Sequence, residues 1–323
     1  MISCAPGKIV LVGEYAVLEG APALVVAVDR YARVTVEYAA PSETLKVTAV
    51  PIGIEATLQR PALTGPETLS LVLPRLRALP PTANAITLDT SSFYFGNDKM
   101  GLGSSAALTV ALERILVPAA DNDELFARAR GEHLRFQSGA GSGIDLAASV
   151  YGGVIRYRIR NPEPPDRVRV KWPIGLTMIA VWSGASADTR TFLKILANFA
   201  SNEPSSYGAL MARLAGLSET SCKLFEAADV EGFLQSIDDY AAGLTRLAQA
   251  AGIPNLTPEH AVIAQIAQSA GARYKPAGAG GGDLGIALCP EQNGAAVREA
   301  LTAAGCVVVP VGRSETGART INE

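Results

Sequence analysis

The sequence contains few of the residues that bind structural metals or form disulfides. Its 323 residues include two histidines and four cysteines, and no two cysteines form a CxxC pair. A structural zinc site holds about four cysteine or histidine ligands at close spacings, so the common zinc-binding modules are excluded. We interpret the cysteines as reduced, mostly buried thiols of a cytosolic protein.

Positive charge and long hydrophobic runs are also scarce. Lysine and arginine number 28 against 31 aspartate and glutamate, a formal net charge of -3 that argues against a generic nucleic-acid-binding protein. No apolar stretch reaches the ~20 residues of a membrane span. Lys8, Glu14 and Glu19 interrupt the first apolar residues, unlike a signal peptide. We therefore expect a cytoplasmic protein that binds neither nucleic acid nor membranes.

Apolar residues are plentiful and follow a mixed pattern. They make up 48% of the chain, against 18% charged residues, which is enough for a sizeable core. The first third reads as short β-branched strands, one of them after a Pro6–Gly7 turn, and the second half alternates strands and helices. Helices on a mostly antiparallel sheet define an α+β architecture. A proline-rich turn predicts two domains, which comprise residues 1–165 and 166–323.

Helices are predicted where apolar residues recur at helical spacing. One is expected from Pro66, and another after an N-cap at Asp121 or Asn122. A largely helical block is expected from about 188 to 252. Thr257 is predicted to cap a helix that begins at Pro258.

Residues 99–112, KMGLGSSAALTVAL, place two glycines and two serines before an apolar helix. A helix N-terminus presents unpaired N–H groups and partial positive charge, and glycines let the backbone approach an anion. Serine hydroxyls can bind phosphate or magnesium. The phosphate-binding candidates are Lys99, Gly101, Leu102, Gly103, Ser104, Ser105 and Ala106. The alternative for this segment alone is a plain turn with Ser104 as N-cap.

Two common phosphate-binding patterns do not fit this segment. The string GxxxxGK[ST] of a P-loop is absent. GLGSSA matches a loose dinucleotide-binding pattern, but a polar loop precedes it and a helix, DNDEL, follows it where strands are required.

Two further glycine-rich segments and one lysine are candidates for chemistry. Asp145 in GSGIDLAASVYGG is either a helix-cap or dipole partner or a catalytic carboxylate. Five glycines within residues 278–285 cost conformational entropy, so this loop is predicted to lie against a ligand or another backbone. Lys8, at the start of the first strand, is either a surface lysine or one held in place by the preceding turn.

Together these segments resemble a known family. APGKIVLVGEYAVLEG, GLGSSAA and GAGGG occur in the order of the three motifs of the GHMP kinase superfamily and span nearly the whole chain. The resemblance implies a two-domain α+β fold with the active site in the interdomain cleft. It also implies ATP and Mg²⁺ as cofactors.

Within the superfamily the chain is most similar to bacterial phosphomevalonate kinases. SSFYFGNDKMGLGSSAA and KPAGAGGGDLGIAL carry this likeness, the latter through Asp283 after the glycines. The implied reaction converts 5-phosphomevalonate to the 5-diphosphate in isoprenoid synthesis. A monomer or homodimer is expected.

The resemblance implies roles at the matching positions. Lys8 is expected to clamp the reacting phosphates electrostatically, and Asp145 to be the catalytic aspartate. Ser104, Ser105 and Glu132 are the implied magnesium ligands, although Glu132 is displaced by a couple of residues from the usual spacing. The implied acceptor-binding residues are Lys8, Ser142, Gly143, Asp145, Ser183, Thr189, Arg190, Lys275, Gly278, Gly280, Gly281 and Asp283.

Two alternatives stay open. The first is a kinase of the same superfamily with an alcohol acceptor, such as mevalonate kinase. The second is a catalytically silent nucleotide-binding protein of the same fold, since fold alone does not establish activity.

Lys99, Arg190 and Lys275 are candidates for binding the acceptor's negative charge, with ordinary surface cations as the alternative.

Overall fold

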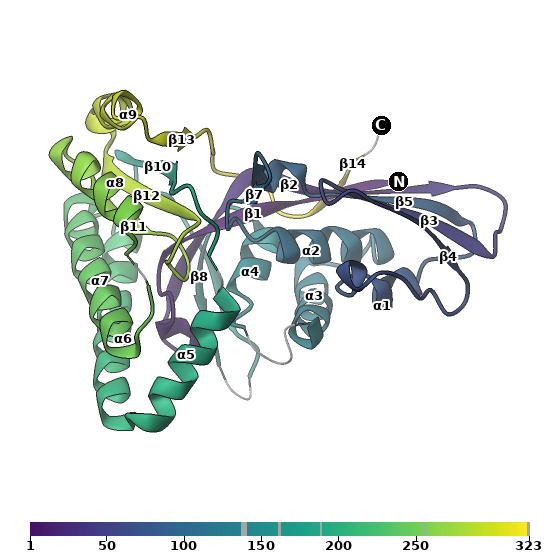
Figure 1. The fold of residues 1–323 in the computed structure, drawn as a ribbon, viewed down its shortest axis with the longest axis horizontal. Helices are drawn as coiled ribbons and strands as arrows, with labels where there is room; N and C mark the ends of the chain where they lie inside the picture. Colours follow the sequence, from purple (N-terminus) through teal and green to yellow (C-terminus); the bar gives the residue numbers. More distant parts are fainter. Residues whose placement is uncertain (137–140, 161–162, 188, 255, 322–323) are drawn as a thin grey trace.

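A computed structural model describes residues 1–136, 141–160, 163–187, 189–254 and 256–321. The described chain forms two halves that lie side by side, an N-terminal half built on a large sheet and a C-terminal half rich in helices (Figure 1). The expected α+β class is confirmed. Among the described strands only β3 and β5 pair in parallel, and the other pairings are antiparallel.

The N-terminal sheet has the strand order β14-β1-β2-β5-β3-β4, with β8 joined to β2 and β9 to β8. Its strands are β1 (Ile2–Val12), β2 (Ala23–Tyr38), β3 (Thr44–Val50), β4 (Ile54–Gln59), β5 (Ala83–Asp89), β8 (Val154–Arg158), β9 (Asp166–Val170) and β14 (Arg319–Ile321). Its helices are α1 (Leu73–Leu76), α2 (Ser104–Leu116), α3 (Asn122–Phe136) and α4 (Ile144–Tyr151). These helices cover one face of the sheet (Figure 1).

The C-terminal half has a smaller sheet of order β11-β12-β10-β13. Its strands are β10 (Leu176–Trp182), β11 (Arg273–Pro276), β12 (Leu284–Pro290) and β13 (Val307–Val309). Its helices are α5 (Thr189–Asn202), α6 (Pro204–Glu226), α7 (Val230–Ala251), α8 (Pro258–Ser269) and α9 (Gly294–Ala303). A short hairpin of β6 (Tyr94–Phe95) and β7 (Asp98–Lys99) and 3₁₀ turns at Ala16–Glu19, Glu67–Leu69, Ser91–Phe93 and Glu291–Asn293 complete the described elements.

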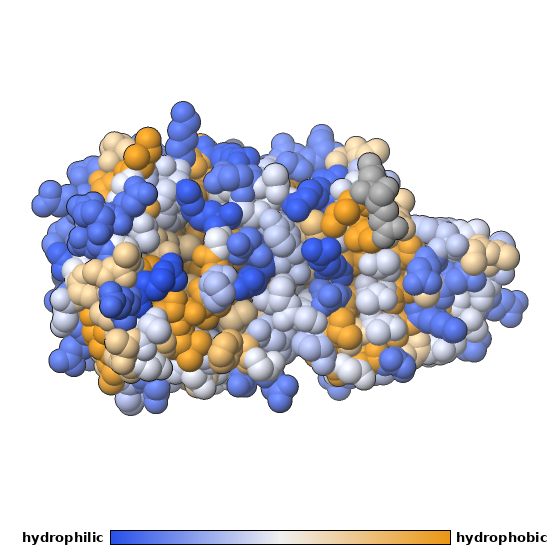
Figure 2. Space-filling view, turned by 90° about the horizontal axis from the view of Figure 1, so that it is seen from above, coloured by the Kyte–Doolittle hydropathy of each residue, from blue (hydrophilic) through white to orange (hydrophobic). Residues whose placement is uncertain are grey.

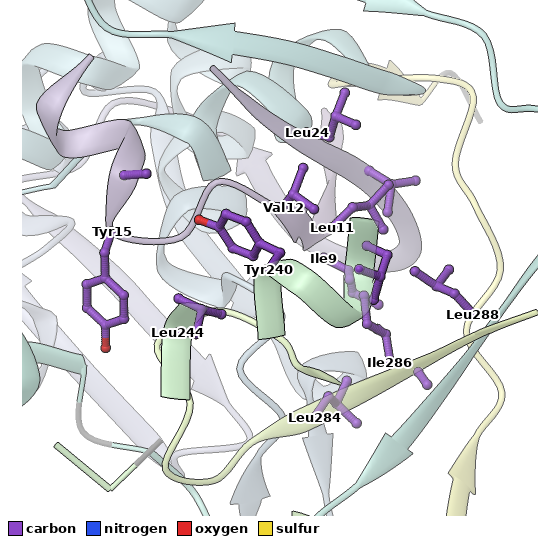
Figure 3. Packing of buried hydrophobic residues seen from close by; sticks show 14 of the residues in the cluster. Ile9, Leu11, Val12, Tyr15, Leu24, Tyr240, Leu244, Leu284, Ile286 and Leu288 are labelled. Carbon is purple, nitrogen blue, oxygen red and sulfur yellow. The ribbon is translucent and has the colours of Figure 1, made fainter. Parts of the chain in front are cut away.

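One hydrophobic cluster joins the two halves. It contains Ile9 and Leu11 of β1 together with Leu284 and Leu288 of β12 and Tyr240 of α7, all almost fully buried. Figure 3 shows these side chains facing one another between the two sheets and α7. The halves are therefore held together by shared apolar burial as well as by the chain connections.

Several predicted elements are confirmed. The helical block expected from about 188 to 252 is formed by α5, α6 and α7 between residues 189 and 251, and position 188 itself lies outside the described residues. Thr257 caps α8 by accepting a hydrogen bond from the His260 N–H at 3.3 Å. Asp121 accepts one from the Glu124 N–H at 2.8 Å at the start of α3, as expected for a capping aspartate.

Two predicted elements differ. The Pro6–Gly7 pair is not a turn, because β1 runs through it with a register shift between the two residues. A bulge is a position where a strand accepts proline, which lacks a donor for the ladder. The helix expected from Pro66 is reduced to a 3₁₀ turn and the single turn of α1, because Pro74 interrupts it.

The chain crosses from the N-terminal half to the C-terminal half after β9. β9 pairs with β8 in the N-terminal sheet, and β14 returns at the end of the chain to pair with β1. An edge strand gains a ladder of hydrogen bonds by joining the nearest open edge, which for both segments lies in the N-terminal sheet.

The surface mixes residue types. In Figure 2 hydrophilic and hydrophobic residues alternate over the face seen from above, and the molecule tapers toward the end that holds β3 and β4. Across the described ranges, helices long and apolar enough to traverse a bilayer are absent. The four cysteines are free, and three of them are buried.

Candidate active site

The start of α2 is built for close approach of other chain segments. Gly101 and Gly103 have φ values of +73° and +79°, which favour glycine. Gly103 is the N-cap of α2, and Ser104 is the first helical residue. The interpretation of Ser104 as an N-cap is therefore wrong. Since glycine has no side chain, no side-chain group caps the start of this helix.

Three elements converge beside Gly103. A Cβ atom at Gly103 would lie 3.1 Å from Cγ of Lys8 and 3.7 Å from Cβ of Asp145. The Lys8 ammonium donates to the Gly101 carbonyl at 2.9 Å, and the Lys8 backbone N–H donates to the Leu102 carbonyl at 2.9 Å. β1, the start of α2 and the start of α4 thus bring a lysine, a helix N-terminus and an aspartate together.

Asp145 lies in the first turn of α4, after the N-cap Gly143 with φ of +78°. One carboxylate oxygen accepts a hydrogen bond from the Leu146 N–H at 3.0 Å. A carboxylate is favourable here because the helix N-terminus carries partial positive charge. Asp145 is therefore held in place by its helix while remaining half-exposed.

A cation that the sequence reasoning missed lies beside this turn. The Nε atom of Arg130, on α3, lies 3.7 Å from the Cβ position of Gly143. Burial raises the pKa of Tyr157 to about 12, the positive charge of Arg130 opposes that rise, and the charge of Asp145 adds to it. The Tyr157 hydroxyl donates to the Ser142 carbonyl at 2.6 Å. In the sequence Arg130 is one of several charges on a helix, and only the packing of α3 against α4 distinguishes it.

The third glycine-rich loop delivers Asp283 to the same place. A Cβ atom at Gly101 would overlap the Asp283 carboxyl group, so the two segments are in direct contact. The carboxylate accepts a hydrogen bond from the Ala187 N–H at 3.1 Å. Burial raises the pKa of Asp283, and the Ala187 N–H and the Lys8 charge oppose that rise. Asp283 itself has φ of +59°, an unusual value for a residue with a side chain.

A pocket of about 550 Å³ opens next to this contact. It is lined by Ile52, Tyr94, Asn97, Asp98, Lys99, Gly101, Ser186, Ala187 and Asp283. The Lys99 ammonium lies 5.9 Å from the centre of the Tyr94 ring and, among the described residues, has no carboxylate partner. An anionic group entering the pocket would therefore meet an unpaired cation.

Three predicted residues are engaged elsewhere. The Lys275 ammonium is fully buried and paired with Glu14, so it is not a free cation for an acceptor. The Glu132 carboxylate bridges Arg75 at 3.3 Å and Arg135 at 2.6 Å. Ser183 is buried and donates to the Ala185 carbonyl at 3.2 Å. Glu14 and Arg75 are distant in sequence from Lys275 and Glu132, so these two ion pairs could not be read from residue spacing, whereas the Glu132–Arg135 pair follows the i,i+3 spacing of a helix.

Thr189 and Arg190 begin α5, but their side chains lie outside the described part of the structure. Ser105 lies one residue into α2, and its hydroxyl is 3.3 Å from Nε2 of His133.

The residues near Gly103 offer oxygen atoms of the kind that bind magnesium in proteins. In the part of the chain that the structure describes, no three His, Cys, Asp or Glu side chains gather as a metal site. Protein-bound Mg²⁺ usually takes one or two carboxylates and completes its shell with water and substrate phosphates. Ser104, which follows Gly103, and Asp145, whose Cβ lies near Gly103, offer a hydroxyl and a carboxylate of that kind, whereas the Glu132 carboxylate is paired with Arg75 and Arg135.

Comparison with known proteins gives two kinds of relative. The chain is 29% identical over 331 residues to a phosphomevalonate kinase of Streptomyces sp. (strain CL190), covering 88% of each chain. It is 29% identical over 294 residues to a mevalonate kinase of Methanothermobacter thermautotrophicus, covering 88% of this chain and 89% of that protein. No family model matches the chain.

A solved structure shows the same fold. Streptococcus pneumoniae phosphomevalonate kinase in complex with phosphomevalonate and AMPPNP superposes with a TM-score of 0.82 at 18% identity. The match covers 97% of this chain and 99% of that one.

Proposed function

Since the homologues and structural neighbours of this chain are GHMP-family kinases, we propose that it transfers the γ-phosphoryl group of ATP to 5-phosphomevalonate. The kinase homologues support a phosphotransferase of the mevalonate pathway as the broader conclusion. The observation that carries the proposal is the convergence of Lys8, the α2 N-terminus, Asp145 and Asp283 beside a pocket lined by Lys99.

The α2 N-terminus supplies the phosphate-binding surface. The glycines at 101 and 103 leave the backbone open, and the first N–H groups of the helix have no intrahelical partner. The Ser104 hydroxyl adds a donor for a phosphate oxygen. This surface suits the nucleotide phosphates because both the dipole and the donors favour negative charge.

Lys8 neutralises negative charge between the γ-phosphate of ATP and the phosphate of the acceptor. An ammonium has three donors, and Lys8 gives one of them to the Gly101 carbonyl, which leaves two for phosphate oxygens. In the transfer the bond from the γ-phosphorus to the bridging oxygen of ADP breaks, and a bond to an acceptor phosphate oxygen forms. Charge stabilisation and in-line positioning dominate such a reaction.

Asp145 orients the reacting groups. A phosphate acceptor is already ionised near neutral pH, so the reaction does not need a strong general base. Asp145 and Ser104 would hold Mg²⁺, which supplies electrostatic neutralisation of the phosphates when bound. The remaining role of Asp145 is to keep Lys8 and the acceptor aligned beside Gly103.

Phosphorylated acceptor chemistry is favoured by Lys99. Its ammonium lines the pocket that adjoins the cradle at Gly101 and has no ion-pair partner among the described residues. A second candidate, mevalonate kinase, is favoured by the equal identity of the Methanothermobacter relative. The two differ in whether the acceptor already carries a phosphate.

An ADP-release assay with Mg-ATP tests the proposal. Phosphomevalonate, mevalonate, diphosphomevalonate, homoserine and galactose are compared at equal concentrations. We expect kcat/KM for phosphomevalonate to exceed that for mevalonate by at least about tenfold, or roughly 1.4 kcal/mol in transition-state binding. Turnover with mevalonate alone would replace the proposal by the second candidate, and turnover with none would favour the silent nucleotide-binding protein.

A further inference from the structure

The glycine loop that follows β11 cannot fix its own conformation. Gly278, Gly280, Gly281 and Gly282 all have positive φ values, between +74° and +146°. Glycine has the widest choice of backbone conformations, so a loop of this composition depends on contacts from outside. Because the loop carries Asp283 to Gly101, those contacts determine the shape of the candidate active site.

The turn after β1 provides contacts at the beginning of the loop. Glu14 pairs with the Lys275 ammonium, and the same carboxylate oxygen accepts a hydrogen bond from the Gly278 N–H at 3.3 Å. The Tyr15 hydroxyl donates to the Ala279 carbonyl at 2.7 Å. We name these five residues, Glu14, Tyr15, Lys275, Gly278 and Ala279, the β1–loop latch.

The latch is buried and fixed from both sides. The Glu14 and Lys275 side chains are 3% and 0% exposed. The Tyr240 hydroxyl of α7 donates to the Glu14 carbonyl at 2.8 Å. Figure 3 shows Tyr240 next to the turn after β1, and Tyr15 belongs to the same buried cluster.

The backbone at the latch is also unusual. Tyr15 has φ of +60°, and Asp283 at the other end of the loop has φ of +59°. Non-glycine residues hold such conformations only where the surrounding contacts impose them, and such positions cluster at functional sites. Both ends of the loop are therefore constrained, one by the latch and one by the Ala187 N–H and Gly101.

We propose that Glu14, Tyr15 and Lys275 are positioning residues that make the glycine loop move with the strand that carries Lys8. β1 holds Lys8 and ends at Val12, two residues before Glu14. The latch then connects that strand end to the loop, and the loop presents Asp283 within the electrostatic field of Lys8. The kinetic consequence rests on the proposed function, whereas the position of the loop does not.

A buried ion pair is weak evidence for a stabilising role. Replacing both partners by apolar residues is often neutral for stability, whereas removing one partner leaves an unpaired buried charge. The hydrogen bond from the Gly278 N–H to Glu14 is therefore the contact to test, in addition to the ion pair with Lys275. Variants that keep or remove this hydrogen bond can distinguish a role of Glu14 in stability from a role in positioning the loop.

Two double variants make this separation. Glu14→Gln with Lys275→Met removes both charges but keeps an acceptor for the Gly278 N–H. Glu14→Leu with Lys275→Met removes both charges and the acceptor. We expect both to melt near the wild-type temperature, with Lys275→Met alone melting lower.

Hydrogen exchange of residues 277–284 and kinase assays then report on the loop. The Gln–Met variant should keep wild-type exchange and a kcat within about threefold of wild type, equivalent to about 0.65 kcal/mol. The Leu–Met variant should exchange faster in this segment and lose at least about tenfold in kcat. Wild-type exchange and kcat in the Leu–Met variant would overturn the proposal.

Tyr15→Phe gives an independent measurement should the Leu–Met variant not fold. It removes the donor to Ala279 and is compared with Tyr31→Phe, which removes a hydroxyl contact to Ser314 at 2.8 Å. Faster exchange of 277–284 is expected only for Tyr15→Phe, and equal exchange in the two would overturn the proposal. If no acceptor is phosphorylated but these exchange differences appear, the proposed function fails and the latch stands.

Discussion

At the scale of single residues, the candidate site contains two lysines in different environments. Lys8 is held by its own backbone contact to Leu102 and by its ammonium on Gly101. Lys99 is instead exposed, with its ammonium over the Tyr94 ring at 5.9 Å from the ring centre. A fixed cation suits charge stabilisation in the transition state, and an exposed one suits recognition of the acceptor. The two lysines should therefore affect different kinetic constants.

Replacement of Lys8 tests the first of these roles. Lys8→Met should lower kcat by roughly 10²–10³-fold or more, because a fixed charge that acts on the transferred phosphoryl group is lost. Steady-state kinetics with ATP and phosphomevalonate measures this, and circular dichroism with a melting curve checks that the fold is intact. A folded Lys8→Met enzyme with near-native kcat removes Lys8 from the mechanism.

Replacement of Lys99 tests its proposed role in recognition of the acceptor. Lys99→Ala should raise KM for phosphomevalonate by about tenfold while changing KM for ATP by less than about threefold, since a single charge pair in a partly open pocket is lost. Lys46→Ala on β3, also an exposed lysine, is the matched control and should change neither constant. Equal loss for both substrates would assign Lys99 to the nucleotide or the fold.

At the scale of elements, α8 is tied to the glycine loop through a buried histidine. Nε2 of His260 lies 3.0 Å from the Gly282 carbonyl, and Nδ1 lies 2.7 Å from the Tyr274 hydroxyl. Burial lowers the pKa of His260, the Gly282 carbonyl and Glu259 oppose that shift, and the charge of Lys275 adds to it. The far end of the loop is thus connected to α8 through the His260 ring.

This link predicts a pH-dependent stability. A histidine whose pKa is lowered by folding stabilises the native state above its unfolded pKa near 6.5, and that contribution declines as pH falls below this value. The free energy of unfolding in urea should therefore fall between pH 7.5 and 5.5, by at most about 1.4 kcal/mol per pH unit from this group.

His260→Gln provides the comparison. Glutamine can hydrogen-bond but does not titrate, so the part of the pH dependence that arises from His260 should disappear. Identical pH profiles for the two proteins would show that His260 does not couple protonation to folding.

At the scale of the whole molecule, the two halves share a core. Leu288 of β12 and Leu11 of β1 are fully buried in one cluster. The chain passes between the halves from β9 to β10 and again from β13 to β14. β14 returns from the C-terminal half to pair with β1. Such shared apolar burial couples the folding of both halves, so they should unfold together.

A single substitution tests this coupling. Leu288→Ala should lower the free energy of unfolding by about 2–5 kcal/mol through lost burial and a residual cavity. Calorimetry should still show one transition, with both halves losing protection from hydrogen exchange together. Ile174→Ala, at a position 94% exposed, is the control and should be nearly neutral. Two separated transitions would show that the halves fold independently.

The sequence by itself determined the α+β class, most of the helices and the three glycine-rich segments that meet at the candidate site. Positive-φ glycines before α2, the aspartate at the start of α4 and the glycine loop before β12 all carry local signals, because turn geometry and helix ends restrict the residues that fit. The α+β class follows from apolar periodicity in the same way. Pro74 shows the limit of that reasoning, since one residue shortened a predicted helix.

Only the tertiary structure decided which charges are free. Lys275 and Lys99 are both lysines next to a glycine-rich motif, yet one is buried against Glu14, 261 residues away, and the other lines a pocket. Arg130 and Glu132 lie two residues apart on α3, but one approaches the site and the other pairs with Arg75. Long-range packing fixes these partners, and the energy of a charge depends on its burial and its neighbours rather than on its position in the chain.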